Sequence, residues 1–203
     1  HQIQCRPYTL AEILHCQVSI PEIDHPLPLF RDYLNRGYYP FALENDFVPK
    51  MIQVVAQTVE VDIPQYADMK ASTARKLKRM LAILATLAPF KPSMESLANE
   101  IGVSKNNVPD YLIYLERAGM IGLLRDDTGG IRNLGKVEKV YIDNPSLMSA
   151  LTSEVNIGNL RETFFYNQMR VNHDVRDSKA SDFSIDGYTF EIGGRKTGKQ
   201  QIE

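Results

Sequence analysis

The sequence has little of what marks three common classes of protein. Its two cysteines, Cys5 and Cys16, follow no Cys-x-x-Cys spacing and its histidines do not cluster, which argues against a disulfide scaffold and a structural zinc site. It has no apolar run of about 18 residues and no signal-peptide pattern. The formal net charge is only −2, so no global field draws the chain to nucleic acid or to an anionic membrane. We therefore expect a cytoplasmic protein without a membrane partner, in which contact with nucleic acid would depend on a local basic patch.

The composition is that of an ordinary globular protein. The chain has 203 residues, of which 43% are hydrophobic and 24% are charged, enough for one large domain or two small ones. It begins with His1 rather than methionine, and we expect it to be a piece of a longer protein.

Prolines punctuate residues 1–70, where short helices are expected. The stretch LFRDYLNRGYYP predicts a helix that ends at Gly37 and is stopped by Pro40. Apolar residues near a 3.6-residue period predict an amphipathic helix over 48–63, closed by Pro64. This part is expected to be a helical connector.

The clearest pattern covers residues 71–150. Two helices, a turn, a third helix and a β-hairpin follow one another, which is the element order of a winged helix-turn-helix. Ser93 is the predicted N-cap of the second helix, and Gly102 its end. Pro109 has no amide hydrogen, so the third helix is expected to start late or to kink.

Two sets of residues in this region are candidates for binding DNA. A DNA-reading helix contacts bases with its first residues, which here are Lys105, Asn106 and Asn107. A cluster of four cations lies near a predicted helix N-terminus, where the dipole disfavours positive charge, and could contact phosphates. Its members are Arg75, Lys76, Lys78 and Arg79. Winged helices also serve as packing modules, so both uses stay open.

Residues 151–203 predict a helix followed by a β-hairpin. The dipeptide Asp186-Gly187 suits a two-residue turn, which fixes the register of the two strands. Counting outward from the turn pairs Ile185 with Tyr188 and Phe183 with Phe190. Because side chains alternate along a strand, these four residues are expected to share an apolar face toward the core.

One step further along the hairpin, Asp182 is predicted to face Glu191, with Cβ atoms roughly 5 Å apart. Like charges in this position are disfavoured unless solvent, a proton or a divalent cation compensates them. With Glu162 from the preceding helix, they would form the acidic set of a phosphodiesterase that uses Mg²⁺ or Mn²⁺. Such a site needs a cation where Gly193 stands, which leaves Lys196 as the candidate for that role. The alternative is an exposed hairpin face that holds no metal.

A second pattern near the end of the chain is a near match to a phosphate-binding loop, from Gly193 to Lys199. Gln200 replaces the Ser or Thr that would hold Mg²⁺, and only three residues remain for the helix whose N-terminus cradles the phosphate. We interpret this match as a coincidence.

Several segments carry a resemblance through their order along the chain. They are RPYTLAEIL, LFRDYLNRGYYPFAL, VEVDI, SMESLANEIGVSKNNVPDYLIYLERAGMI, KVYIDNPSL and IGNLRETFFYNQMR with SDFSIDGYTFEIGGRK. Together they resemble the bacterial and archaeal AAA-type ATPases that carry a C-terminal domain of unknown function. The resemblance implies a terminal module similar to the restriction-endonuclease-like fold, with Glu162, Asp182 and Glu191 at its acidic positions and Gly193 at the position of its lysine. It also implies that an ATPase core, which binds ATP, precedes His1.

The sequence therefore predicts an α+β protein in three parts: a helical connector (1–70), a winged helix-turn-helix (71–150) and a degenerate nuclease-like module (151–203). No phosphate-binding loop or arginine finger is demonstrable, so we expect a non-catalytic region that binds DNA or protein. Its expected partners are double-stranded DNA, another protein or its own ATPase core. The alternatives are a metal-dependent nuclease that uses Asp182 and Glu191, and a structural oligomerisation module.

Overall fold

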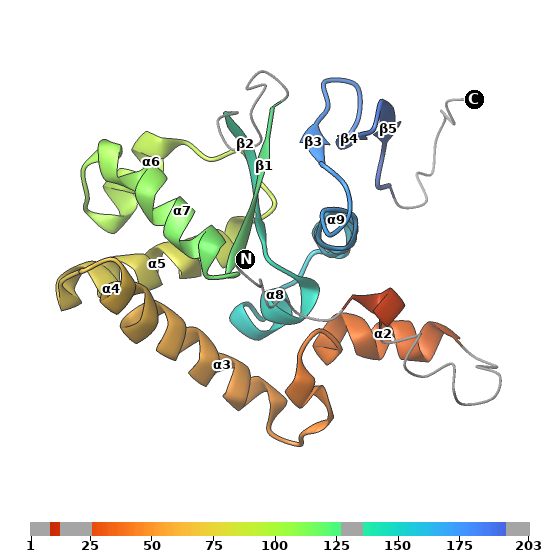
Figure 1. Cartoon of the computed structure of the whole chain (residues 1–203), viewed down its shortest axis with the longest axis horizontal. Coiled ribbons are helices and arrows are strands. Elements are labelled where there is room, and N and C mark those ends of the chain that lie inside the picture. Colours follow the sequence, from red (N-terminus) through yellow and green to blue (C-terminus); the bar gives the residue numbers. More distant parts are fainter. Residues whose placement is uncertain (1–8, 13–25, 127–135, 194–203) are drawn as a thin grey trace.

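A computed structural model of the chain describes residues 9–12, 26–126 and 136–193. Helices predominate, and two small antiparallel sheets complete an α+β fold, as the sequence predicts. In Figure 1 a central β-hairpin, formed by β1 (Ile121–Arg125) and β2 (Val137–Ile142), stands between two groups of elements. The described residues contain no helix that is long and apolar enough to cross a membrane.

The first part of the chain is helical. Its elements are α2 (Pro26–Arg36), the 3₁₀ turn η1 (Pro40–Leu43), α3 (Phe47–Gln57), the π-helical η2 (Thr58–Asp62) and α4 (Ile63–Tyr66). Pro64 lies inside this last helical run, so the prediction that it closes the helix is wrong. A proline has no amide hydrogen to bond the carbonyl one turn earlier, and the wider π turn before it accommodates the ring without ending the helix.

Three helices follow in the predicted order. They are α5 (Ala71–Leu87), α6 (Met94–Ile101) and α7 (Val108–Arg117), with a 3₁₀ turn, η3 (Lys105–Asn107), before α7. The Ser93 hydroxyl accepts a hydrogen bond from the Ser96 amide, and Gly102 ends α6 in the left-handed region at φ 67°, which confirms both predicted boundaries. The late start of α7 is also confirmed, because Pro109 lies in its first turn and residues 105–107 are not α-helical.

The β1–β2 hairpin is buried on both faces. Ile121, Leu123, Val140 and Ile142 pack into a core with α3 and α5–α8, called here the helical core. Leu124 and Tyr141, which point to the other face, belong to a smaller cluster with Tyr166, Val175, Phe183 and Ile185, called here the aromatic core. Alternation along the two strands therefore connects the two cores through a single hairpin.

After β2 the chain forms two more helices. Helix α8 (Pro145–Leu151) begins directly behind the hairpin, with the Asn144 side chain accepting from the Leu147 amide at 2.9 Å as its N-cap. Helix α9 (Ile157–Met169) is the helix predicted from the sequence, and its Tyr166 stacks on Tyr141 at 4.7 Å between ring centroids. Helix α9 thus closes the aromatic core over the second face of the hairpin.

The last sheet consists of β3 (Arg176–Asp177), β4 (Phe183–Ile185) and β5 (Tyr188–Phe190), in that order. The register of β4 and β5 is the predicted one, and Asp186 and Gly187 have φ angles of 52° and 85° in the turn. Phe183 and Ile185 are buried as expected, but Tyr188 is 73% exposed. The prediction that Tyr188 faces the core is wrong, because it stands beside the turn at the end of the hairpin, where no other element of the described chain covers it.

Candidate functional site

Two of the three predicted acidic residues meet at a lysine that the sequence analysis did not select. Lys139 of β2 lies with its Nζ 3.5 Å from a Glu162 oxygen and 3.7 Å from an Asp182 oxygen. The side chains of these residues are only 20–29% exposed, so water screens the three charges incompletely. We call this group the Lys139 cluster. It brings together a strand of the central hairpin, helix α9 and the start of β4.

Glu162 is partly buried, and a neighbouring cation offsets part of the effect of burial on its pKa. Burial raises the pKa of the Glu162 carboxyl, Lys139 opposes this rise, and Asp182 adds to it. The Tyr141 hydroxyl lies 3.3 Å from the same carboxylate oxygen, and burial raises the pKa of Tyr141 above its usual value. Tyr141 therefore stays protonated and donates to Glu162, so Lys139 and Tyr141 together stabilise the half-buried carboxylate.

Asp182 and Glu191 lie one position beyond the last pair of the β4–β5 ladder, Phe183 with Phe190. Asp182 turns inward, and its carboxylate accepts from the Ile192 amide at 2.7 Å. Glu191 follows β5 on the exposed surface. Within the described ranges, no three histidine, cysteine or acidic side chains are grouped so that they could hold a metal ion. Gly193 is exposed, and Lys196 and the near match to a phosphate-binding loop beyond Gly193 lie outside the described residues.

The four cations of the predicted phosphate-binding cluster lie on α5, but not at its N-terminus. The helix begins at Ala71, so these residues occupy its second and third turns, where the helix dipole has little effect. Lys76 donates to the Gly102 carbonyl at 2.6 Å, and Lys78 pairs with Glu60. Arg75 and Arg79 are exposed and have no partner among the described residues. Two of the four cations are thus engaged in contacts within the chain, and the other two are available to bind a ligand.

The residues predicted to contact bases are all exposed. Lys105, Asn106 and Asn107 form the 3₁₀ turn in front of α7, and Lys105 lies 3.9 Å from Glu95. Asp110, in the first turn of α7, adds a negative charge to the same end of the helix. The surface next to these three residues therefore carries both signs of charge.

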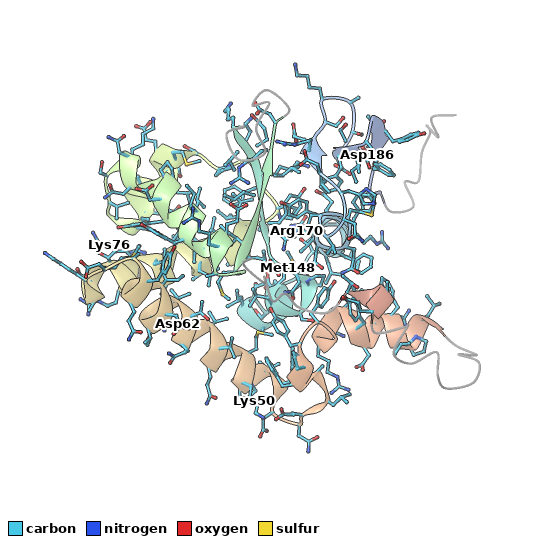
Figure 2. All side chains as sticks on the ribbon, viewed as in Figure 1. Lys50, Asp62, Lys76, Met148, Arg170 and Asp186 are labelled. Atoms are coloured by element: carbon cyan, nitrogen blue, oxygen red, sulfur yellow. The ribbon has the colours of Figure 1, made fainter. Side chains whose placement is uncertain are left out.

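A buried polar junction behind the hairpin was missed at the sequence level. Asp143, 5% exposed, pairs with Arg170 of α9 and accepts from the Asn144 side-chain amide at 3.0 Å. Asn144 also donates to the Tyr39 hydroxyl at 2.9 Å, and Asn167 donates to the Asp143 carbonyl at 2.9 Å. Figure 2 shows Arg170 near the centre of the molecule, between α9 and the hairpin. The stretch Asp143-Asn144-Pro145 carried a signal for part of this, because Asn followed by Pro is typical of a helix start.

The junction lies beside a cleft of about 790 Å³. The cleft is bounded by α3, the end of α7, the edge of β1, the end of α9 and the segment before β3. Its charged lining includes Glu116, Arg117, Arg125, Asp143, Arg170, Asp174 and Arg176. No local pattern in the sequence predicts this cleft, because its walls come from segments that are far apart in the chain.

Comparison with protein families gives one match. The family described as "Domain of unknown function (DUF8612)" matches residues 27–158, which include α3, α5–α8 and the central hairpin. No match was found among curated proteins or among solved structures.

Proposed function

The chain belongs to the family described as "Domain of unknown function (DUF8612)", and we propose that it is a non-catalytic, protein-binding region of an AAA-type ATPase. The resemblance of its ordered segments to those ATPases supports the parent class. The order of α5, α6, α7 and the β1–β2 hairpin supports a winged helix-turn-helix, and α9 with β3–β5 supports a degenerate nuclease-like module.

The Lys139 cluster carries the non-catalytic part of the proposal. In a metal-dependent nuclease, the carboxylates are compensated by a divalent cation that also activates water. Here Lys139 supplies a positive charge within 4 Å of both Glu162 and Asp182. The Ile192 amide and the Tyr141 hydroxyl use further lone pairs of the same two carboxylates. These acidic residues therefore act as a link between the hairpin, α9 and β4.

The distribution of cations favours protein over DNA as the partner. Of the four lysines and arginines on α5, Lys76 caps the carboxyl end of α6 and Lys78 pairs with Glu60. A DNA-reading helix presents its first residues to the major groove, but here Asp110 stands in the first turn of α7. Binding to the phosphate backbone needs several available cations on one face.

The direct test of the non-catalytic role is incubation of the chain with supercoiled plasmid in the presence of Mg²⁺ or Mn²⁺. We expect the plasmid to remain intact with the wild type and with Asp182→Ala alike. Cleavage by the wild type that disappears in Asp182→Ala would show that the carboxylates are catalytic, and would overturn the proposal.

Double-stranded DNA is the second candidate partner, because Arg75 and Arg79 are exposed and have no partner among the described residues. Fluorescence anisotropy with a labelled duplex at several salt concentrations separates the two partners. If DNA is the partner, affinity falls steeply with salt and drops further in the Arg75→Ala/Arg79→Ala double variant. For a protein-binding region, we expect weak duplex binding that the double variant does not change.

A further inference from the structure

The edge of β1 opens into the cleft at Leu123, whereas beyond the end of the strand Arg176 of β3 donates to the Asp126 carbonyl at 3.2 Å. The central hairpin has two strands, so each strand has an edge that its partner does not cover. On the β2 side, Phe90 forms a bridge to Val140 and covers that edge locally. On the β1 side, Leu123 lines the cleft, together with Met51 and Val54 from α3. A strand edge with apolar side chains beside it is the kind of surface to which extended peptides bind.

Two side chains hold the edge of β1 in place of a neighbouring strand. The Leu123 amide donates to a Glu116 carboxylate oxygen at 3.3 Å, and Arg125 Nη1 donates to the Leu123 carbonyl at 3.2 Å. Arg125 also binds Glu116 through two hydrogen bonds, of 3.0 and 2.8 Å. We call this arrangement the Glu116–Arg125 clasp. It occupies the donor and the acceptor that one residue of an added strand would use together in an antiparallel pair.

We propose that the cleft binds an extended, acidic peptide segment of a partner protein, which adds to the edge of β1 at Leu123 and displaces the Glu116–Arg125 clasp. The proposal rests on the proposed function, in that the partner is a protein. Main-chain hydrogen bonds at Leu123 provide the affinity, and Val54, which is 39% exposed, offers an apolar surface in the cleft to a side chain of the peptide.

The charges that line the cleft indicate that the peptide carries negative charge. Arg125, Arg170 and Arg176 each pair with a carboxylate that also lines the cleft: Glu116, Asp143 and Asp174, respectively. Arg117 lines the same cleft, is exposed, and has no carboxylate partner within the described part of the chain. The lining therefore has an excess of positive charge, and an acidic side chain of the peptide would complete a pair with Arg117.

The test begins with selection from a displayed library of random linear peptides on the intact wild-type chain. Enriched peptides are then titrated into isotopically labelled chain while the amide shifts are followed by NMR. We expect enriched peptides to carry acidic residues and to shift the amides of Leu123 and Arg125. N-methylation of alternate peptide amides should lower the affinity at least about tenfold, because added strands bind through their main chain.

Two variants examine the clasp and the charge separately. Removing the clasp in Glu116→Ala/Arg125→Ala should tighten binding of the same peptides by roughly three- to tenfold, because no internal hydrogen bonds have to be displaced. Arg117→Glu should weaken acidic peptides several-fold. Arg31→Glu is the matched control, because this exposed arginine lies on α2 and does not line the cleft, and it should leave the affinity unchanged.

Failure of this inference is distinct from failure of the proposed function. Peptides that bind but shift amides outside the cleft would overturn the β1 site and leave a protein-binding region in place. A library that yields no peptide would also overturn the inference, and the clasp would then serve only to protect a strand edge. If the same chain cleaves plasmid in an Asp182-dependent way, the non-catalytic role fails, whereas the amide shifts of Leu123 and Arg125 still decide the β1 site.

Discussion

The two faces of the central hairpin differ in kind. The face toward the helical core carries Ile121, Leu123, Val140 and Ile142, all of them apolar and at most 4% exposed. The face toward α9 carries Leu124 and Tyr141 and also the charged Lys139. The side chains of the first face are apolar and stabilise the packing of the helices by burial of apolar area. The second face adds the ion pairs of Lys139 and the hydrogen bond of the Tyr141 hydroxyl, which depend on one geometry. Glu162 and Asp182 thus form, with Lys139, the polar part of the contact between the hairpin, α9 and the start of β4.

The largest expected effects come from two adjacent leucines that point to opposite faces. Leu123→Ala removes contacts from the helical core and Leu124→Ala from the aromatic core; the residues are 4% and 0% exposed. We expect each change to lower the free energy of unfolding by about 3 kcal/mol. Because both cores share one hairpin, urea unfolding followed by circular dichroism should remain a single transition in both variants.

The coupling of the two cores through the hairpin is contradicted if urea unfolding of Leu124→Ala shows two transitions, of which only one is shifted to lower urea concentration. The parts 71–150 and 151–203 would then unfold independently, and the hairpin would not couple them.

The next effect concerns the space on the α9 face. A Cβ atom at Gly122 would lie 2.4 Å from Tyr166 Cε1 and 2.5 Å from Arg170 Nη1. We expect Gly122→Ala to lower the free energy of unfolding by about 2 kcal/mol, and with it the melting temperature, because the Tyr166 ring has to move away from Tyr141. Gly193→Ala is the control, since no atom of the described residues lies within 4 Å of its Cβ position. Equal melting temperatures for the two variants would contradict the close contact.

Lys139→Met should have a smaller effect, of about 1–2 kcal/mol at neutral pH, because it leaves two half-buried carboxylates without their cation. Lys136→Met is the matched control directly before the same strand, since Lys136 is 68% exposed and pairs with Glu138. Chemical denaturation of both variants gives the comparison. A loss of stability that is equal in the two variants would mean that the position of Lys139 between the carboxylates is irrelevant.

The smallest effect is the pH dependence that Glu162 contributes. Its pKa in the folded chain is raised above the unfolded value of about 4.5, so the folded state binds the proton more tightly. Its contribution to stability should therefore rise as the pH falls from neutral toward 4.5, and be lost again as the pH rises through the folded pKa. Glu162→Gln should flatten this part of the stability profile. Unchanged profiles would show that Glu162 does not titrate in this range.

Sequence reasoning predicted the local features well. The turn at Asp186-Gly187 fixed the register of β4 and β5, and Pro109 delayed the start of α7, because both effects depend on the backbone of a few neighbouring residues. Tyr188 was placed wrongly because alternation predicts the face of a strand but not how far the covering element extends.

The Lys139 cluster could not be predicted in the same way. Lys139 lies 23 residues from Glu162 in the chain, and its role depends on how α9 packs against β2. Strand alternation allowed Lys139 to point toward α9. No local pattern predicted that the carboxylates of Glu162 and Asp182 would lie within 4 Å of it. The cleft likewise depends on five distant segments, and only the tertiary structure assembles them.

The most direct test of the central claim is a calorimetric titration of Mn²⁺ into the wild-type chain, Lys139→Met and Lys139→Met/Asp182→Asn. If Lys139 is the built-in counter-ion of Glu162 and Asp182, the wild type should give no saturable heat. Lys139→Met should then gain weak, saturable binding, which the double variant loses. Saturable binding by the wild type that Asp182→Asn alone abolishes would contradict the account, because the carboxylates would then hold a metal ion while Lys139 is present.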